Sequence, residues 1–338
     1  MFRLKQFVEL FLNDTLVEIR GNRICLIEST VLVDSARIQG ASYGKEFALA
    51  MKNIALIFDF DDTLMPDSTT ELIRQHGVDP EEFWGSTVKD YLLNGYEPAL
   101  AYLNRLLEYA GKGKPLGPMT NAGLREFGKS LAPNFYSGLS TMLKELREIA
   151  QAVSSDINVE FYIVSGGLQD LISDIPLVTK HFAAVYGCQF GEHPKTGVIY
   201  QVKKCVTFTE KTRYLFEINK GISPSQVEEN RYAVNKDIPV ARRRVPFKNM
   251  IYVGDGLTDI PCFSLVKRMG GMAFGVFNPT EARSAKRALL EFLSTDRVIS
   301  MHAPRFRKTD ELGALLRAAV STVAQRAYLE RSEAEFEE

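Results

Sequence analysis

Three apolar runs in this chain each stop abruptly at a cluster of polar residues, and this arrangement constrains the fold more than any other feature. The runs are 53–58, 159–164 and 250–253, and the clusters are 59–63, 165–167 and 254–259. A continuous apolar run of this kind is typical of a strand buried on both faces, as in a parallel sheet. Because parallel strands end at one edge of their sheet, we expect the three clusters to meet there.

Helical patterns lie between these strands. Their alternation with the strands predicts an α/β fold, a Rossmann-like parallel sheet with helices on both faces and a helical segment inserted after the first strand. The predicted parts are an N-terminal extension at 1–50, the core at 51–65 and 141–308, the helical insertion at 66–140, and a C-terminal helix with an acidic tail at 309–338.

Turn and cap signals predict the shorter elements. Gly21-Asn22 is a two-residue turn signal between two strands, and a short helix over 2–12 precedes this hairpin. Ser68 is expected to be the N-cap of the first inserted helix, paired with Glu71 in a capping box. Further expectations are helices at 98–109, 139–153 and 168–175, a hairpin over 186–208, and irregular chain at 222–245.

The charge balance excludes some partners. Basic and acidic side chains number 41 and 42, so bulk charge favours neither nucleic acid nor an anionic membrane as a partner. Apolar runs stay well short of the roughly 18–20 residues that a membrane span needs. The four cysteines are scattered, without metal-ligand spacing. We therefore expect a cytoplasmic protein with no nucleic acid or membrane partner.

The acidic clusters indicate a particular chemistry. Crowded carboxylates repel one another unless a cation lies between them, and oxygen ligands suit a hard ion, best Mg²⁺. A carboxylate can also attack phosphorus and form an aspartyl-phosphate. The glycines beside Ser165 allow backbone N–H groups to approach a phosphate closely. Such a site also needs a lysine, and Lys211 lies near the start of a predicted helix.

These motifs, in this order from about Met51 to about Phe277, resemble the haloacid dehalogenase (HAD) superfamily, in its phosphoserine-phosphatase-like branch. The resemblance implies a HAD fold in which the insertion at 66–140 is a mobile cap. It also implies the following roles: Asp59 as nucleophile, Asp61 as general acid and base, Thr63, Ser165, Gly166 and Lys211 at the phosphate, and Asp59, Asp61, Asp255 and Asp259 at Mg²⁺. In this scheme Asp61 binds Mg²⁺ through its backbone carbonyl, and Asp259 acts mostly through water.

Several alternatives remain open on the sequence. Lys203 and Lys204, in the predicted hairpin, compete with Lys211 for the lysine role, whereas Lys220 lies too far along its helix. Residues 1–50 are either an accessory element or the result of an upstream start, because a protein of this kind could begin at Met51. The aromatic residues of the insertion are expected to pack its own small core, with a substrate pocket as the alternative. They are Trp84, Tyr91, Tyr96 and Tyr102.

The predicted function is hydrolysis of a small phosphorylated metabolite. A phosphotransferase with another acceptor would use the same residues, whereas a non-catalytic binding protein would be expected to lose some of them. Phosphoserine phosphatase is a third alternative. In that enzyme a glutamate meets the substrate's amino group nine residues after the nucleophile, and here that position is Ser68. Phosphoserine is therefore not the expected substrate, and the oligomeric state is not indicated.

Overall fold

The computed structural model describes residues 16–20, 23–27 and 53–336, and the chain divides into two compact units, 1–42 and 43–338. In the first unit, strands β1 (Leu16–Arg20) and β2 (Arg23–Ile27) pair in antiparallel fashion, with Arg20 opposite Arg23. This pairing confirms the predicted hairpin. The predicted helix over 2–12 lies outside the described residues.

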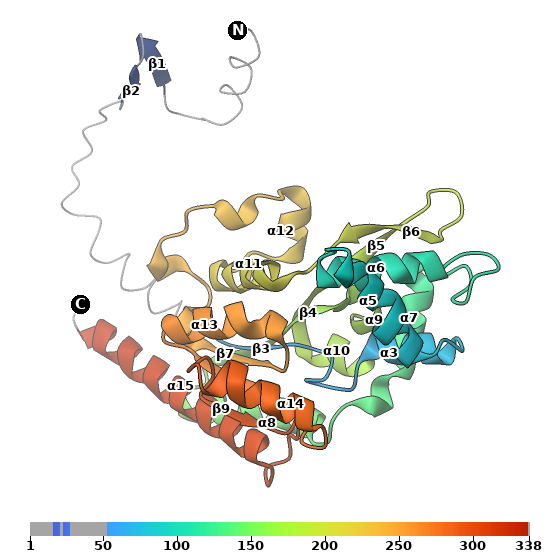
Figure 1. The fold of residues 1–338 in the computed structure, drawn as a ribbon. Coiled ribbons are helices and arrows are strands. Elements are labelled where there is room, and N and C mark those ends of the chain that lie inside the picture. The colour runs from blue at the N-terminus through green and yellow to red at the C-terminus, as the bar shows by residue number, and fades with distance from the viewer. Residues whose placement is uncertain (1–15, 21–22, 28–52, 337–338) are drawn as a thin grey trace. The chain divides into compact units, whose positions relative to one another are not determined.

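The second unit is built on a seven-stranded sheet in the order β6-β5-β4-β3-β7-β8-β9 (Figure 1). All neighbouring strands are parallel except β5 and β6. The strands are β3 (Asn53–Phe58), β4 (Asn158–Leu168), β5 (Phe182–Glu192), β6 (Ile199–Lys204), β7 (Met250–Gly254), β8 (Met272–Val276) and β9 (Ser300–His302). The predicted α/β fold with a mainly parallel sheet is confirmed.

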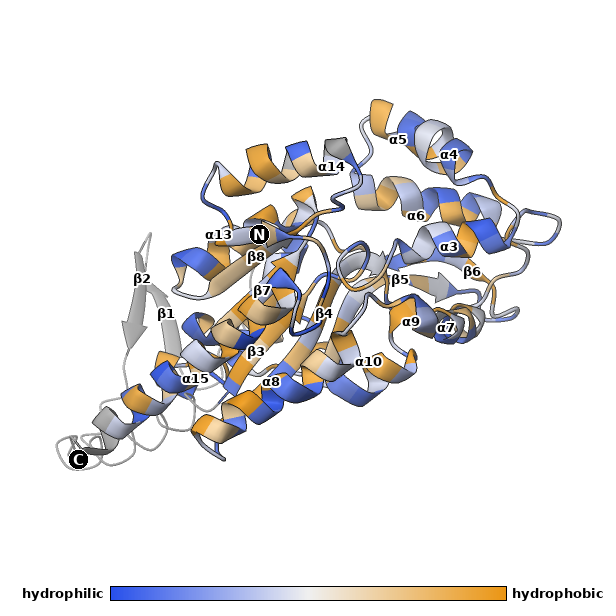
Figure 2. Cartoon of the chain, turned by 90° about the horizontal axis from the view of Figure 1, so that it is seen from below, coloured by the Kyte–Doolittle hydropathy of each residue, from blue (hydrophilic) through white to orange (hydrophobic). Residues whose placement is uncertain are grey.

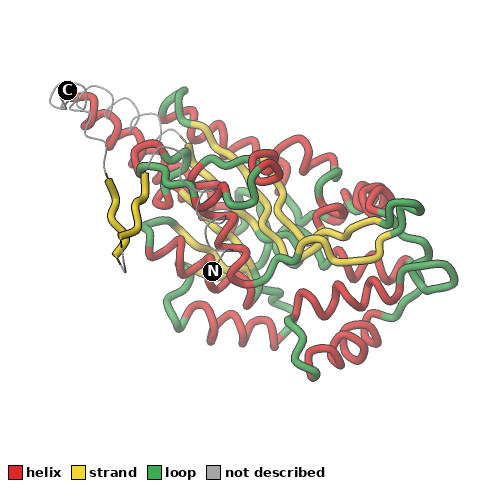
Figure 3. The backbone as a smooth tube through the Cα atoms, turned by 90° about the horizontal axis from the view of Figure 1, so that it is seen from above, coloured by secondary structure: helices red, strands yellow, loops and turns green. Residues whose placement is uncertain are grey.

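Helices cover both faces of this sheet, so its central strands are buried on both sides. Figure 1 shows α8 (Leu139–Val153) and α15 (Glu311–Phe336) on one face, and α11 (Phe208–Lys220) and α13 (Ile260–Arg268) on the other. In the tube view the strands lie between these helical layers (Figure 3). The central strands β3 and β7 are largely hydrophobic (Figure 2). Their burial explains why they read as continuous apolar runs.

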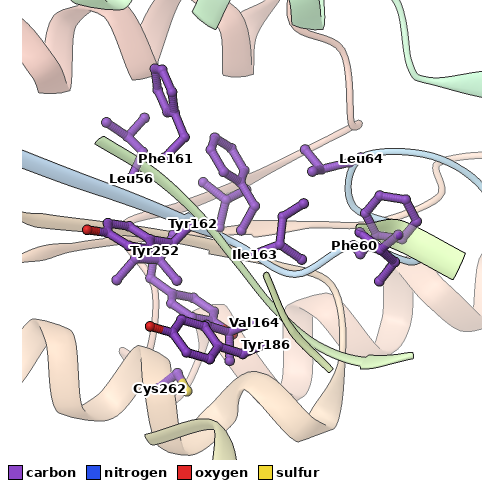
Figure 4. Close-up of a cluster of buried hydrophobic side chains, with 14 of the residues drawn as sticks. Leu56, Phe60, Leu64, Phe161, Tyr162, Ile163, Val164, Tyr186, Tyr252 and Cys262 are labelled. Carbon is purple, nitrogen blue, oxygen red and sulfur yellow. The ribbon is translucent and has the colours of Figure 1, made fainter. Parts of the chain in front are cut away.

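The core of the sheet consists of large apolar and aromatic side chains from neighbouring strands. The side chains of Leu56, Phe161 and Tyr252 are fully buried, and Figure 4 places them within one cluster. Tyr252 stands out in this cluster because it brings a hydroxyl group into an otherwise apolar environment. A buried hydroxyl needs a hydrogen-bond partner, and the partner of Tyr252 belongs to the site described below.

The insertion after β3 is helical, as predicted. Its helices are α3 (Ser68–Gln75), α4 (Pro80–Glu82), α5 (Lys89–Leu93), α6 (Pro98–Tyr109) and α7 (Asn121–Ser130), with a π-helical turn at Phe83–Val88. Helix α7 packs on the core helix α9 (Gln169–Ile172). A Cβ atom on Gly128 would lie 1.9 Å from the carbonyl oxygen of Leu171, so only glycine permits this approach.

Two predictions about helices were wrong. The N-cap of α3 is Asp67, whose side chain accepts from the backbone N–H of Thr70, and Ser68 is the first helical residue. Glu71 pairs with Arg74 instead of closing a capping box. Aspartate caps a helix as well as serine does, so the pattern alone could not separate the two positions. The helix predicted over 168–175 is the shorter α9, and α10 (Pro176–His181) begins a new helix at Pro176.

The other differences concern strand ends and loops. Strand β4 continues through Ser165 to Leu168, because β5 runs beside it and Leu168 pairs with Cys188. The register shifts between Val164 and Leu168, so the polar cluster lies in an irregular part of the strand. The stretch 222–245 contains helix α12 (Pro224–Glu229), capped reciprocally by Ser223 and Gln226. Helix α14 (Ala282–Arg287) precedes β9. Among the described helices, none is long and apolar enough to cross a membrane.

Candidate active site

Acidic side chains from two strand ends meet at the carboxyl edge of the sheet. Asp59 directly follows β3, Asp255 directly follows β7, and Asp259 lies in the 3-10 turn after it. One carboxylate oxygen from each of the three lies within 4.8 Å of the others. Since β3 and β7 are parallel neighbours, their ends bring together residues that lie about 200 positions apart in the sequence.

Lys211 lies between two of these acids. Its side chain comes from α11 and is 0% exposed, and its Nζ lies 2.7 Å from Asp259 Oδ1 and 3.1 Å from Asp59 Oδ2. Burial by itself lowers the pKa of Lys211, but the carboxylates of Asp259 and Asp59 raise this pKa above its ordinary value. The ammonium is therefore held in its charged form.

The rival lysines with described contacts point elsewhere. The Nζ of Lys204 lies 4.9 Å from the ring centre of Tyr214. The Nζ of Lys220 donates to the backbone carbonyls of Val234 and Lys236. Of these candidates, Lys211 is the one that contacts the acidic cluster.

Asp259 is held by three donors of the protein. Its Oδ1 accepts from Lys211 and from the Tyr252 hydroxyl at 2.7 Å, and its Oδ2 accepts from the backbone N–H of Gly256 at 2.9 Å. A Cβ on Gly254 would lie 2.5 Å from Asp259 Oδ2, so this carboxylate fits under the end of β7 because position 254 is glycine. Asp259 thus anchors Lys211.

Asp59 is almost fully buried, and its Oδ1 accepts from the backbone N–H of Phe60 at 2.8 Å. Burial and, to a smaller extent, the nearby Asp259 carboxylate raise the pKa of Asp59 to about 6. The contact with Lys211 acts in the opposite direction and favours the ionised form. Near neutral pH the group is therefore available as an anion.

Asp61 has a different environment. Its Oδ1 accepts from the backbone N–H of Ser68 at 2.7 Å, and a Cβ on Gly167 would lie 2.4 Å from its Oδ2. Burial, together with the negative charge of Asp67, raises the pKa of Asp61 well above its ordinary value. A carboxyl group with a raised pKa can carry a proton near neutral pH and donate it. Asp59 and Asp61 thus differ in the charge state that their surroundings favour.

The polar cluster of β4 lies beside these acids. Ser165 is buried, and its Oγ accepts from the backbone N–H of Gly167 at 2.9 Å. The carbonyl oxygen of Gly166 accepts from the Tyr102 hydroxyl at 2.5 Å and from Cys188 Sγ at 3.2 Å. Tyr102 belongs to α6, so this hydrogen bond joins the insertion to the sheet edge.

A cavity of about 350 Å³ opens where the insertion faces this edge of the sheet. We call its sheet side the floor, formed by Asp59, Asp61, Ser165, Gly166 and Asp255 above the buried Lys211 and Asp259. We call the part of its lining that comes from residues 84–102 of the insertion the wall. The wall is formed by Trp84, Val88, Leu92, Glu97, Pro98, Ala99 and Tyr102.

Thr63 is 0% exposed and does not line the cavity, and its hydroxyl has no partner among the described residues, so its contact with phosphate stays a prediction.

Trp84 and Tyr102 line the cavity. Tyr91 and Tyr96 pack against each other with ring centres 4.4 Å apart. Trp84 also packs against Phe83 and Tyr102, with ring centres 5.0 and 5.9 Å apart, so these aromatic residues pack within the insertion and two of them also line the cavity.

No family model matches the chain. An uncharacterised protein of Borreliella burgdorferi is 29% identical over 237 residues, which covers 64% of this chain and 79% of that protein.

Among solved structures, a HAD family hydrolase from Salmonella enterica serovar Typhi is similar with a TM-score of 0.47 and 13% identity, covering 93% of this chain and 92% of its own. A substrate-bound phosphoserine phosphatase has a TM-score of 0.45 and 15% identity, covering 78% and 97%. A probable phosphoserine phosphatase from Vibrio cholerae has a TM-score of 0.45 and 15% identity, covering 83% and 69%. The chain resembles the HAD superfamily, and the order of its motifs along the sequence carries that resemblance.

The sequence did not point to the residues that hold the carboxylates of the site in place or make room for them. Tyr252 holds Asp259, and Asp67 lies beside Asp61. The glycines at 167 and 254 leave room for carboxylates. A polar hydroxyl inside the third apolar run was the available signal for Tyr252. The contacts of the glycines had no local signal, since each involves a residue from elsewhere in the fold or from a following turn.

Proposed function

We propose that this chain is a Mg²⁺-dependent phosphatase that hydrolyses a small phosphomonoester through an aspartyl-phosphate on Asp59. The observation that carries the proposal is the contact of Lys211 with Asp59 at the floor of a cavity that Asp61 also lines. A buried cation beside the nucleophile stabilises the negative charge of a phosphoryl group.

The two aspartates would divide the chemistry between them. A carboxylate oxygen of Asp59 attacks phosphorus, the bond from phosphorus to the ester oxygen breaks, and Asp61 gives its proton to that oxygen. The Asp61 carboxylate then takes a proton from a water molecule as this water attacks phosphorus. The bond to Asp59 breaks and inorganic phosphate leaves. The raised pKa of Asp61 supports the protonated form that the first step needs.

Ser165 would bind the phosphoryl group. Its oxygen already accepts from the backbone N–H of Gly167, so its own hydrogen is available for a phosphate oxygen in the cavity. The adjoining backbone of Gly166 also lines the cavity. A short polar side chain next to two glycines suits the close approach of a phosphate.

The donor set fits Mg²⁺. Asp59 and Asp255 would hold the ion, with the backbone carbonyl of Asp61, because all these ligands are oxygens and their charges need a cation. Asp259 is engaged by three protein donors and would act by positioning Lys211. When bound, Mg²⁺ would neutralise charge on the phosphoryl group.

The cellular setting follows the same proposal. The three described cysteines, Cys188, Cys205 and Cys262, are free, and free thiols suit a reducing compartment. We therefore propose a cytoplasmic enzyme acting on a small phosphorylated metabolite.

The test is phosphate release from an aryl phosphate by the purified protein with Mg²⁺. The same sample is quenched in acid and assayed for phosphoprotein. We expect turnover together with an acid-stable, alkali-labile phosphoenzyme that is missing in Asp59→Asn. Turnover without any dependence on Asp59 would refute the mechanism, and a lack of turnover and of phosphoenzyme with aryl and acetyl phosphate would refute the proposed function.

A further inference from the structure

We propose that Tyr102 is a positioning residue that couples the placement of the insertion to the binding of phosphate by Ser165. It acts through the peptide group between Gly166 and Gly167. This inference rests on the proposed phosphatase function and concerns how the floor is held in its binding geometry. Two hydrogen bonds, one on each side of that peptide group, support it.

The peptide group between Gly166 and Gly167 has side-chain partners on both sides. Its carbonyl oxygen accepts from the Tyr102 hydroxyl at 2.5 Å, and its N–H donates to Ser165 Oγ at 2.9 Å. A peptide group is planar and trans, so its carbonyl and its N–H point in opposite directions and turn together. A donor that fixes the direction of the carbonyl therefore also fixes the direction of the N–H toward Ser165.

This peptide group benefits from an external donor. Both of its residues are glycines, which allow a wide range of backbone angles. It also lies where the register between β4 and β5 shifts, between Val164 and Leu168, so the strand pairing around it is irregular. The hydrogen bond from Tyr102 limits this freedom from the side of the insertion.

The direction of the N–H decides what Ser165 can offer to a ligand. While its Oγ accepts from Gly167, the serine hydrogen is available to a phosphate oxygen, since a hydroxyl has one donor and two acceptor positions. If the peptide group turned, Ser165 would lose this partner and its hydroxyl could rotate. Hydrogen bonds in such a chain also polarise and strengthen one another. Tyr102 thus acts on the phosphate through Ser165.

The second donor to the Gly166 carbonyl comes from the core. Cys188 in β5 donates through its Sγ at 3.2 Å, and a thiol is a weaker donor than a hydroxyl. The Tyr102 hydroxyl, in contrast, reaches this carbonyl only while α6 lies against the edge of the sheet. The ring of Tyr102 also belongs to the wall. A leaving group that contacts wall and floor together would therefore hold Tyr102 in the position that orients Ser165.

Tyr102→Phe tests the inference, because it removes the hydroxyl and keeps the ring that packs against Trp84. We expect kcat/KM for an aryl phosphate to fall by about 5- to 10-fold, the size of one hydrogen bond between neutral groups. The inhibition constant of inorganic phosphate should rise by a similar factor, because this probe has no leaving group and needs only the floor. Circular dichroism verifies that the variant is folded.

A double-mutant cycle separates positioning from a general structural effect. If Tyr102 acts through Ser165, Tyr102→Phe should change kcat/KM by less than about 1.5-fold in the Ser165→Ala background, whereas independent effects would add. Tyr91→Phe is the matched control, because the Tyr91 hydroxyl belongs to the same insertion, donates to Glu108 and does not line the cavity. This control should keep the parent kcat/KM and the parent inhibition constant.

The outcomes distinguish this inference from the proposed function. An unchanged kcat/KM or phosphate inhibition constant in folded Tyr102→Phe, the full loss also in the Ser165→Ala background, or a similar loss in Tyr91→Phe would each overturn the inference while leaving a working phosphatase. A parent protein that hydrolyses neither aryl nor acetyl phosphate would overturn the proposed function, and the inference with it.

Discussion

The floor and the wall of the cavity use polar groups in opposite ways. On the floor, charged groups are buried and bonded to each other, as Lys211 is to Asp59 and Asp259. In the wall, Trp84 and Tyr102 direct their polar atoms into the protein and present ring surfaces. A phosphoryl group is the same in every phosphomonoester, so a rigid charged floor suits it. The leaving group differs between substrates, and an apolar wall can select among them.

The largest effect should follow from removing the nucleophile on the floor. Asp59→Asn is expected to lower kcat by on the order of 10⁵–10⁶-fold, the size seen when a covalent nucleophile is lost. The fold should persist, because asparagine has the same shape and its Oδ1 can still accept from Phe60. Steady-state kinetics and circular dichroism check these two points. Near-parent turnover by a folded variant would show that another residue is the nucleophile.

Removal of the metal should also abolish turnover. We expect dialysis against a chelator to abolish turnover and Mg²⁺ to restore it, whereas Ca²⁺ should restore it poorly. The proposed ligands are few and come from the ends of rigid strands, which suits a small octahedral ion better than Ca²⁺. Elemental analysis accompanies the assay. Full activity in a sample without bound metal would remove the ion from the mechanism.

A smaller loss is expected for the proton donor. Asp61→Asn should lower kcat by about 10²–10⁴-fold, the usual contribution of general acid–base catalysis. Substrates whose leaving group needs no proton, such as a nitrophenyl phosphate, should lose less in the first step than alkyl phosphates do. An equal loss for both kinds of substrate, measured in single-turnover experiments, would argue that Asp61 serves binding instead.

The wall should discriminate more modestly. Phosphoserine is expected to be a poorer substrate than aminoalkyl phosphates by about 10- to 100-fold in kcat/KM, because its carboxylate would face an acidic lining without a cationic partner. Glu71 does not substitute for the missing amino-group ligand, since it pairs with Arg74. Measurement of kcat/KM for these substrates under one set of conditions tests this prediction. A clear preference for phosphoserine that Glu71→Gln removes would contradict it.

The ionisation of Asp59 should also change the free energy of unfolding. Burial raises the pKa of Asp59 to about 6 in the folded protein, above the value of an exposed aspartate. The free energy of unfolding that the protonated side chain contributes is therefore lost as pH rises from about 4 through 6. Without metal, Asp59→Asn should therefore gain stability over the parent by about 1–3 kcal/mol between pH 4 and pH 7. Chemical denaturation at both pH values measures this gain, and parallel pH curves for the two proteins would exclude it.

Much of this molecule follows from local patterns. The continuous apolar runs predicted β3, β4 and β7, and the helical spacing predicted α6 at 98–109 and α8 at 139–153 with their observed bounds. Gly21-Asn22 predicted the pairing of β1 with β2. Ends were less certain: β4 extends past Val164 because its neighbour β5 continues beside it, and pairing with a distant strand leaves no mark on the local sequence.

The sequence by itself determined which chemical groups stand at the ends of the strands, since a buried parallel strand must be apolar and the first polar residue after it must reach the edge. Only the tertiary structure decided which lysine meets the acids. Lys203, Lys204, Lys211 and Lys220 are alike as residues, but α11 directs Lys211 between Asp59 and Asp259. It also decided that Trp84 and Tyr102 face the cavity while Tyr91 and Tyr96 do not. The physical reason is that each of these placements depends on contacts between segments far apart in the chain.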